Sequence, residues 1–137
     1  MSKSVLLRSV AAAALLGLVA GLFTLTAYAA VDAPTNVGLR VIKATPLKGR
    51  LKGTVQVKWT TATEVGVLGY TVYRERGKVR TKVNKALVVA LGGARGGTYS
   101  VRDKLPKTLK GKLTYRLQGL GADGSKAFIG SAKVTIK

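Results

Sequence analysis

The chain has 137 residues, which is room for one domain rather than two. It contains no cysteine and no histidine, so disulfides, thiol nucleophiles, Ser-His-Asp relays and metal sites built from His or Cys are excluded. Lysine and arginine number 24 against 5 acidic residues, and the formal net charge of +19 favours anionic partners such as nucleic acid, acidic polysaccharide, or a membrane or wall surface.

The first 29 residues have the pattern of a secretory signal peptide. Lys3 and Arg8 precede an apolar run over residues 10–25, and the small-residue motif A-Y-A closes the segment at 27–29. This pattern predicts cleavage after the motif and a mature domain of residues 30–137 that is secreted, held at the cell surface or kept in the periplasm. The alternative is an uncleaved membrane anchor, but the apolar run is short for a span of roughly 20 residues.

Residues 30–137 are predicted to form short β-strands. Apolar and polar residues alternate with a period of two over segments of four to eight residues, and turn-like stretches such as "GGARGG" and "GADG" separate the segments. About eight such strands in one small domain predict an antiparallel β-sandwich. In chain order the predicted strands are 36–41, 54–60, 69–74, 78–84, 86–91, 98–103, 113–118 and 131–137.

The stretch "WTTATEVGVLGYTVYR" places a lone glutamate between two of these strands. Trp59 ends one strand and Tyr70 begins the next, so residues 60–69 are expected to form the connection. Threonine hydroxyls and the Glu64 carboxylate are expected to bond to nearby backbone N–H groups there. A general acid or base at Glu64 would need a second titratable partner, which the scattered acids do not supply. Three hydrophobic residues are expected to pack beneath the connection: Val65, Val67 and Leu68.

Three stretches together resemble a known family. They are "VQVKWTTATEVGVLGYTVYR", "KVNKALVVALGGARGGTYSVRDKLP" and "LTYRLQGLGADGSKAFIGSAKV". Their pattern is similar to that of bacterial secreted fibronectin type III-like domains. The resemblance covers residues 34–136 and implies a fibronectin type III/immunoglobulin-like antiparallel β-sandwich of about 7–8 strands. It implies core positions for Trp59 and Tyr70, and a corner tyrosine at Tyr115 with Leu105 packed in that corner. It says little about function, because such modules serve as spacers, adhesive units and appendages of secreted enzymes.

Other candidate sites have simpler interpretations. The glycine-rich segment 91–98 lacks the Gly-Lys-Ser/Thr of a phosphate-binding loop, and "GADG" has one carboxylate, far short of a calcium loop. Serine nucleophiles have no histidine to activate them. We therefore expect no catalytic residues, no cofactor, no metal and no small-molecule substrate.

Positive charge gathers where the fibronectin-like topology places three connections at one pole of the sandwich. The alternative is that these side chains only solvate loops and blunt edge strands, but solvation does not explain why acids are so rare. Lys133 and Lys137 are expected to approach this pole, whereas Arg95 and Lys126 belong to the other. The predicted anion-binding residues are Lys43, Lys48, Arg50, Lys52, Arg74, Arg76, Lys78, Arg80, Arg102, Lys104, Lys107, Lys110 and Lys112.

Two functions remain open. The first is a non-enzymatic binding or adhesion module for an anionic extracellular polymer, such as polysaccharide, cell envelope or DNA. The second is a structural or assembly subunit whose basic pole docks on an acidic protein partner. A membrane partner is expected only if the signal segment stays uncleaved.

Overall fold

The computed structural model describes residues 37–91 and 93–137. The predicted signal peptide lies outside these residues, as does Asp32. In the described part the chain forms eight strands and one short 3₁₀ helix, η1 (Gly49–Leu51). The strands are β1 (Val37–Pro46), β2 (Thr54–Glu64), β3 (Val67–Arg76), β4 (Val79–Lys82), β5 (Val88–Val89), β6 (Thr98–Lys104), β7 (Gly111–Gly121) and β8 (Lys126–Ile136).

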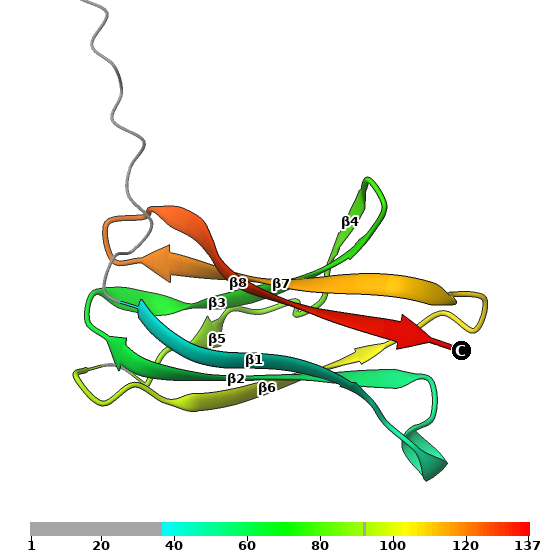
Figure 1. Ribbon diagram of the computed structural model, residues 1–137. Coiled ribbons are helices and arrows are strands. Elements are labelled where there is room, and N and C mark those ends of the chain that lie inside the picture. Colours follow the sequence, from blue (N-terminus) through cyan, green and yellow to red (C-terminus); the bar gives the residue numbers. More distant parts are fainter. Residues whose placement is uncertain (1–36, 92) are drawn as a thin grey trace, which may run out of the picture.

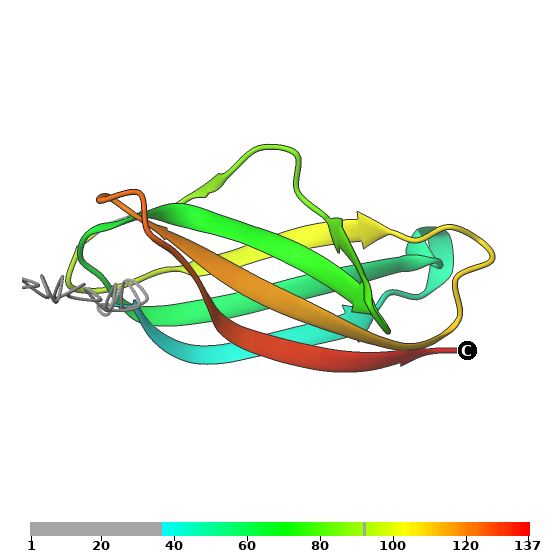
Figure 2. The same cartoon turned by 90° about the horizontal axis from the view of Figure 1, so that it is seen from above.

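These strands form two stacked antiparallel sheets (Figure 1). The first sheet has the order β1-β2-β6, and the second has the order β4-β3-β7-β8, with β5 also paired to β3. Figure 2 shows the two layers from above, with their long strands running along the same axis of the domain. The prediction of an all-β antiparallel sandwich is confirmed. No helix in the described ranges is long and apolar enough to span a membrane.

The core lies between the sheets and follows the period-two pattern. β2 turns Val55, Val57 and Trp59 inward, and each is fully buried. The Trp59 ring stacks on Tyr99 of β6 with centroids 5.4 Å apart, and it meets Tyr70 of β3 edge-on at 5.6 Å. Tyr70 is fully buried as well. The predicted core positions of the two aromatic residues Trp59 and Tyr70 are therefore confirmed.

The sandwich closes along the side where β1 faces β8. A Cβ atom at Gly130 of β8 would collide with the Leu39 side chain of β1. The glycine thus lets an edge strand of one sheet approach an edge strand of the other, which covers that side of the core.

The predicted connection over residues 60–69 is wrong. β2 continues to Glu64 and β3 begins at Val67, so the turn is only Val65–Gly66, with Gly66 at φ 75°. Threonine favours strands, and a register shift against β1 inserts an extra residue into β2. Of the three hydrophobic residues expected beneath the turn, Val67 is buried, whereas Val65 and Leu68 are 53% and 47% exposed.

The apolar run at 86–91 forms much less strand than predicted. Only Val88 and Val89 pair with β3, and Val89 and Leu91 are 69% and 75% exposed. The short pairing depends on Gly69 of β3, because a Cβ atom at this position would collide with the Val88 carbonyl oxygen.

Candidate anion-binding site

Glu64 lies in the interior and fastens three strands together. Its Oε1 atom accepts hydrogen bonds from the hydroxyls of Thr61 and Tyr70, and its Oε2 atom accepts one from Tyr99, all at 2.7 Å. The register shift in β2 allows Thr61 and Glu64 to face inward together. Backbone N–H groups do meet the threonines, since Thr61 Oγ1 accepts from the Gly97 N–H and Thr63 Oγ1 accepts from the Gly38 N–H. The hydroxyl donors to Glu64 were not foreseen from the sequence. The arrangement gives Glu64 a structural role, as predicted, with the carboxylate shielded from solvent.

The second buried acid, Asp103 of β6, pairs with Arg74 across the sandwich. Arg74 Nη1 lies 2.9 and 2.7 Å from the two carboxylate oxygens, and the Tyr115 hydroxyl donates to Oδ2 at 2.7 Å. The side chains of Arg74 and Asp103 are only 12% and 8% exposed. Arg74 is therefore half-buried in an internal ion pair and does not belong to the predicted anion-binding pole. Tyr115 and Leu105 are buried near this pair, as the resemblance implied.

The tyrosines beside the two buried carboxylates have raised pKa values. Burial raises the pKa of Tyr70, Tyr99 and Tyr115, because the charged phenolate would lose its hydration. The hydrogen bonds to Glu64 or Asp103 raise each pKa further, because the carboxylate favours the protonated hydroxyl. Three neutral phenols thus complete the two carboxylate networks.

On the outer face of the second sheet, one carboxylate is shared by two arginines. Glu75 lies 2.6 Å from Arg80 and 3.7 Å from Arg116. The two guanidinium groups each lie 4.8 Å from the centre of the Phe128 ring. Cation–π contacts and the shared carboxylate therefore hold this cluster together. Arg80 is engaged in it, although the sequence suggested that it would meet an external anion.

The outer face of the first sheet carries unbalanced positive charge. Lys43 of β1 stands directly opposite Lys58 of β2, and both are exposed. Like charges in this position destabilise a sheet, so protein stability alone gives no reason for the pair. Arg102 and Lys104 extend the charge along β6. We call Lys43, Lys58, Arg102 and Lys104 the basic face.

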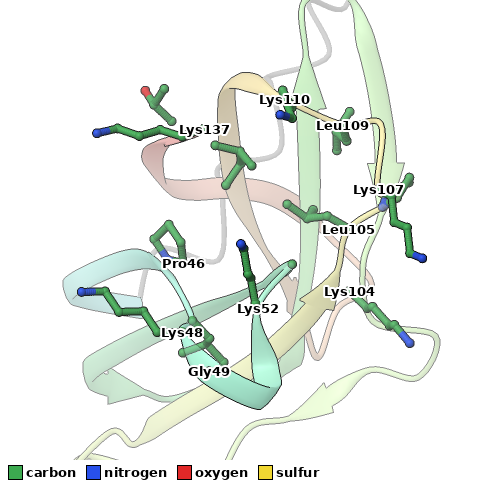
Figure 3. Close-up of a pocket in the computed structure, with 15 residues that line it drawn as sticks. Pro46, Lys48, Gly49, Lys52, Lys104, Leu105, Lys107, Leu109, Lys110 and Lys137 are labelled. Carbon is green, nitrogen blue, oxygen red and sulfur yellow. The ribbon is translucent and has the colours of Figure 1, made fainter.

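A groove opens at the end of the sandwich where the basic face stops (Figure 3). Its volume is about 750 Å³, and it lies between the β1–β2 connection, the β6–β7 connection and the C-terminal end of β8. Figure 3 shows Lys52 reaching into the space between Pro46 and Leu105. We call it the lysine groove, after the six lysines that line it: Lys48, Lys52, Lys104, Lys107, Lys110 and Lys137.

The lining of the lysine groove has two components. Lysine ammonium groups supply donors and positive charge but no acceptors. The apolar part of the lining, which we call the apolar floor, is made by Pro46, Leu47, Leu105, Pro106, Leu109 and Ile136. No acidic or aromatic side chain is among the described residues that line the groove.

The structure separates the members of the predicted pole. Five of its members line the groove, and Lys137 joins them. Lys43 and Arg102 lie on the basic face, while Arg50 and Lys112 are exposed at η1 and at the start of β7. Arg76 and Lys78 lie at the β3–β4 turn, which contributes nothing to the groove lining. Figure 1 shows this turn standing apart from η1.

Lys58 is the member of the basic face that sequence reasoning missed. Its position between inward-facing Val57 and Trp59 predicts an outward side chain. Only the register of β1 against β2 shows that it faces Lys43.

The remaining charges lie elsewhere. Asp123 lies in the β7–β8 hairpin, where the side chain and backbone of Ser125 bond to its carboxylate and lower its pKa. The prediction that "GADG" forms a turn between two strands is confirmed, and the turn closes a β-hairpin. Arg95 and Lys126 are exposed near the β5–β6 and β7–β8 connections, away from the groove. Among residues 37–91 and 93–137, no three His, Cys, Asp or Glu side chains gather into a potential metal site.

Comparison with known proteins adds little. No protein-family model and no curated protein matches the sequence. Among solved structures, the crystal structure of pectate lyase Pel3 from Pectobacterium carotovorum is similar with a TM-score of 0.43 and 15% sequence identity. The match covers 74% of this chain and 27% of the pectate lyase chain, and it carries no information about what this chain does.

Proposed function

We propose that this protein is a secreted, non-enzymatic fibronectin type III-like module that binds anionic polymers of the cell surface or its surroundings. The observation that carries the proposal is the segregation of charge. Glu64 and Asp103 are buried. Glu75 lies on the second sheet, where it is shared by two arginines of the same sheet. The basic face and the lysine groove therefore remain as one positive surface with no acidic side chain among their described residues.

The fibronectin-like assignment is supported by the arrangement of the strands. A β1-β2-β6 sheet packed on a β4-β3-β7-β8 sheet puts the β1–β2 and β6–β7 connections at the same end. A binding role agrees with the chemistry of that end, because its lysine ammonium groups supply positive charge and hydrogen-bond donors for an anion. Both buried carboxylates are engaged in internal hydrogen bonds.

Clustered cations bind a polyanion by releasing its counterions together, so the affinity should fall steeply with salt concentration. The test is retention of the purified protein on heparin and on DNA at two salt concentrations. Lys52→Glu with Lys110→Glu removes two cations from the groove. Arg95→Glu with Lys126→Glu removes the same number at the other pole. We expect the groove variant to elute at much lower salt than the control variant.

Two outcomes would contradict this proposal. Equal loss in the two double variants would mean that only net charge matters. If the unaltered protein is not retained at all, an acidic protein partner becomes the better hypothesis. In that case the protein should assemble into oligomers or require its partner.

A further inference from the structure

The apolar floor of the lysine groove is not explained by a purely hydrophilic polymer. Leu47, Leu109 and Ile136 are only partly buried, and they face an open volume of about 750 Å³. A hydrophilic polyanion would satisfy the lysines but leave these side chains next to water. Aromatic rings on which a nucleic-acid base could stack are absent from the described lining.

We propose that the lysine groove binds an amphiphilic anion, namely an alkyl chain that carries a phosphate, sulfate or carboxylate head. This inference rests on the proposed function and names a ligand class for the same site. The alkyl chain covers the leucines and Ile136 of the apolar floor, and the head pairs with lysine ammonium groups such as that of Lys52, which reaches into the groove. Lysine suits this geometry, because its methylene stem packs on apolar surface while its charge stays in water.

The dimensions and charge of the groove are compatible with such a ligand. Its volume falls within the range of about 300–1,000 Å³ that is typical of small-molecule sites. Six lysines without a lining carboxylate make the groove complementary to the head. A neutral amphiphile would leave these like charges uncompensated, so the charge of the head should matter as much as the length of the chain.

The test is a titration calorimetry series with inorganic phosphate and with octyl, decyl and dodecyl phosphate, each below its micelle concentration. If the chain lies on the floor, each added methylene should raise the affinity by up to about fourfold until the floor is covered. Dodecyl maltoside, which has a neutral head, should bind much more weakly. An affinity that is independent of chain length, or equal for the neutral detergent, would overturn the inference.

Variants separate this inference from polymer binding. Leu109→Ser places a hydroxyl on the floor and should reduce the gain per methylene, while retention on heparin is unchanged. Lys52→Gln with Lys110→Gln should weaken every alkyl phosphate, whereas Lys126→Gln should not. If heparin is retained but no alkyl phosphate binds more tightly than phosphate, the inference fails and the proposed function stands. If the protein is not retained on heparin but alkyl phosphates bind with the expected length dependence, the proposed polymer binding fails and the inference stands.

A second arm identifies the source of the ligand. Vesicles of phosphatidylglycerol are compared with vesicles of phosphatidylcholine in a sedimentation assay. Sedimentation with the anionic vesicles alone, lost in the Lys52→Gln and Lys110→Gln variant, supports the inference with a membrane lipid as the source. Binding of monomeric alkyl phosphates without vesicle binding supports it with a free amphiphile as the source.

Discussion

Replacement of Glu64 tests whether its carboxylate holds the two sheets together. Thr61 belongs to β2, Tyr70 to β3 and Tyr99 to β6, so the three hydroxyls that donate hydrogen bonds to Glu64 come from both sheets. Around this cluster, Thr61 Oγ1 accepts from the Gly97 N–H and the Tyr99 hydroxyl accepts from the Leu91 N–H. Loss of the acceptor should therefore disturb the β5–β6 connection as well.

The expected magnitudes follow from the number of donors. Glu64→Ala leaves three buried hydroxyls without their acceptor and opens a cavity, which should lower the free energy of unfolding by about 3–5 kcal/mol. Glu64→Gln keeps the volume and one acceptor oxygen, but it turns charged hydrogen bonds into neutral ones and presents an N–H group to a hydroxyl. We expect a loss of about 2–3 kcal/mol, because a hydrogen bond to a charged group contributes about 1.5–3 kcal/mol against about 1 for a neutral one.

Guanidinium denaturation followed by the fluorescence of Trp59 measures both variants. Trp59 is the sole tryptophan and stacks on Tyr99, so its emission reports on this region. Tyr99→Phe, which removes one donor, should cost less than either replacement of Glu64. The reasoning is refuted if Glu64→Ala costs less than about 1 kcal/mol, which is within the range of ordinary surface substitutions and their errors.

Three further predictions concern the interior. Asp103→Asn should cost about 3–5 kcal/mol in denaturant melts, because it leaves the half-buried Arg74 and the buried Tyr115 hydroxyl without the carboxylate that they share. The triple replacement Arg74→Met, Asp103→Leu and Tyr115→Phe should recover most of that loss, and a triple variant no better than the single one would contradict this. The pKa values of Tyr70, Tyr99 and Tyr115 are raised in the folded protein, so these tyrosines do not change stability below the unfolded-state pKa of about 10. Above that pH they ionise in the unfolded chain while they stay protonated in the folded one. Each tyrosine should therefore lower the free energy of unfolding by up to about 1.4 kcal/mol per pH unit. Melts from about pH 9 to about pH 11 check this, and Tyr70→Phe should reduce the slope; an unchanged slope would show that Tyr70 does not contribute. Gly96→Ala should destabilise the fold by more than the ~1 kcal/mol of an ordinary substitution, because Gly96 has φ 64° and a Cβ atom there would collide with the Thr61 carbonyl. Gly77→Ala is the control, because Gly77 has φ 57° but open space around it. Equal melting temperatures of the two variants would contradict the steric argument.

The strands and the centre of the core could be predicted from the sequence because they depend on local alternation. Val55, Val57 and Trp59 alternate with polar residues, so one face of their strand had to be buried. The turn at Asp123 and Gly124 is equally local. The same alternation could have predicted the outward side chain of Lys58, although the sequence analysis did not include this residue.

Tertiary structure alone decided which charges are free. Arg74 was predicted to be a surface cation beside a turn. Its alternation with Tyr70 and Val72 already places it on the inward face of β3, but only the tertiary structure shows that its partner is Asp103, 29 positions along the chain. The register shift in β2 made Glu64 an interior acceptor, and it depends on pairing with β1. Likewise, the lysine groove joins Lys48, Lys104 and Lys137 from three separate connections and ends. No local pattern could bring these residues together, because their proximity depends on how the two sheets stack.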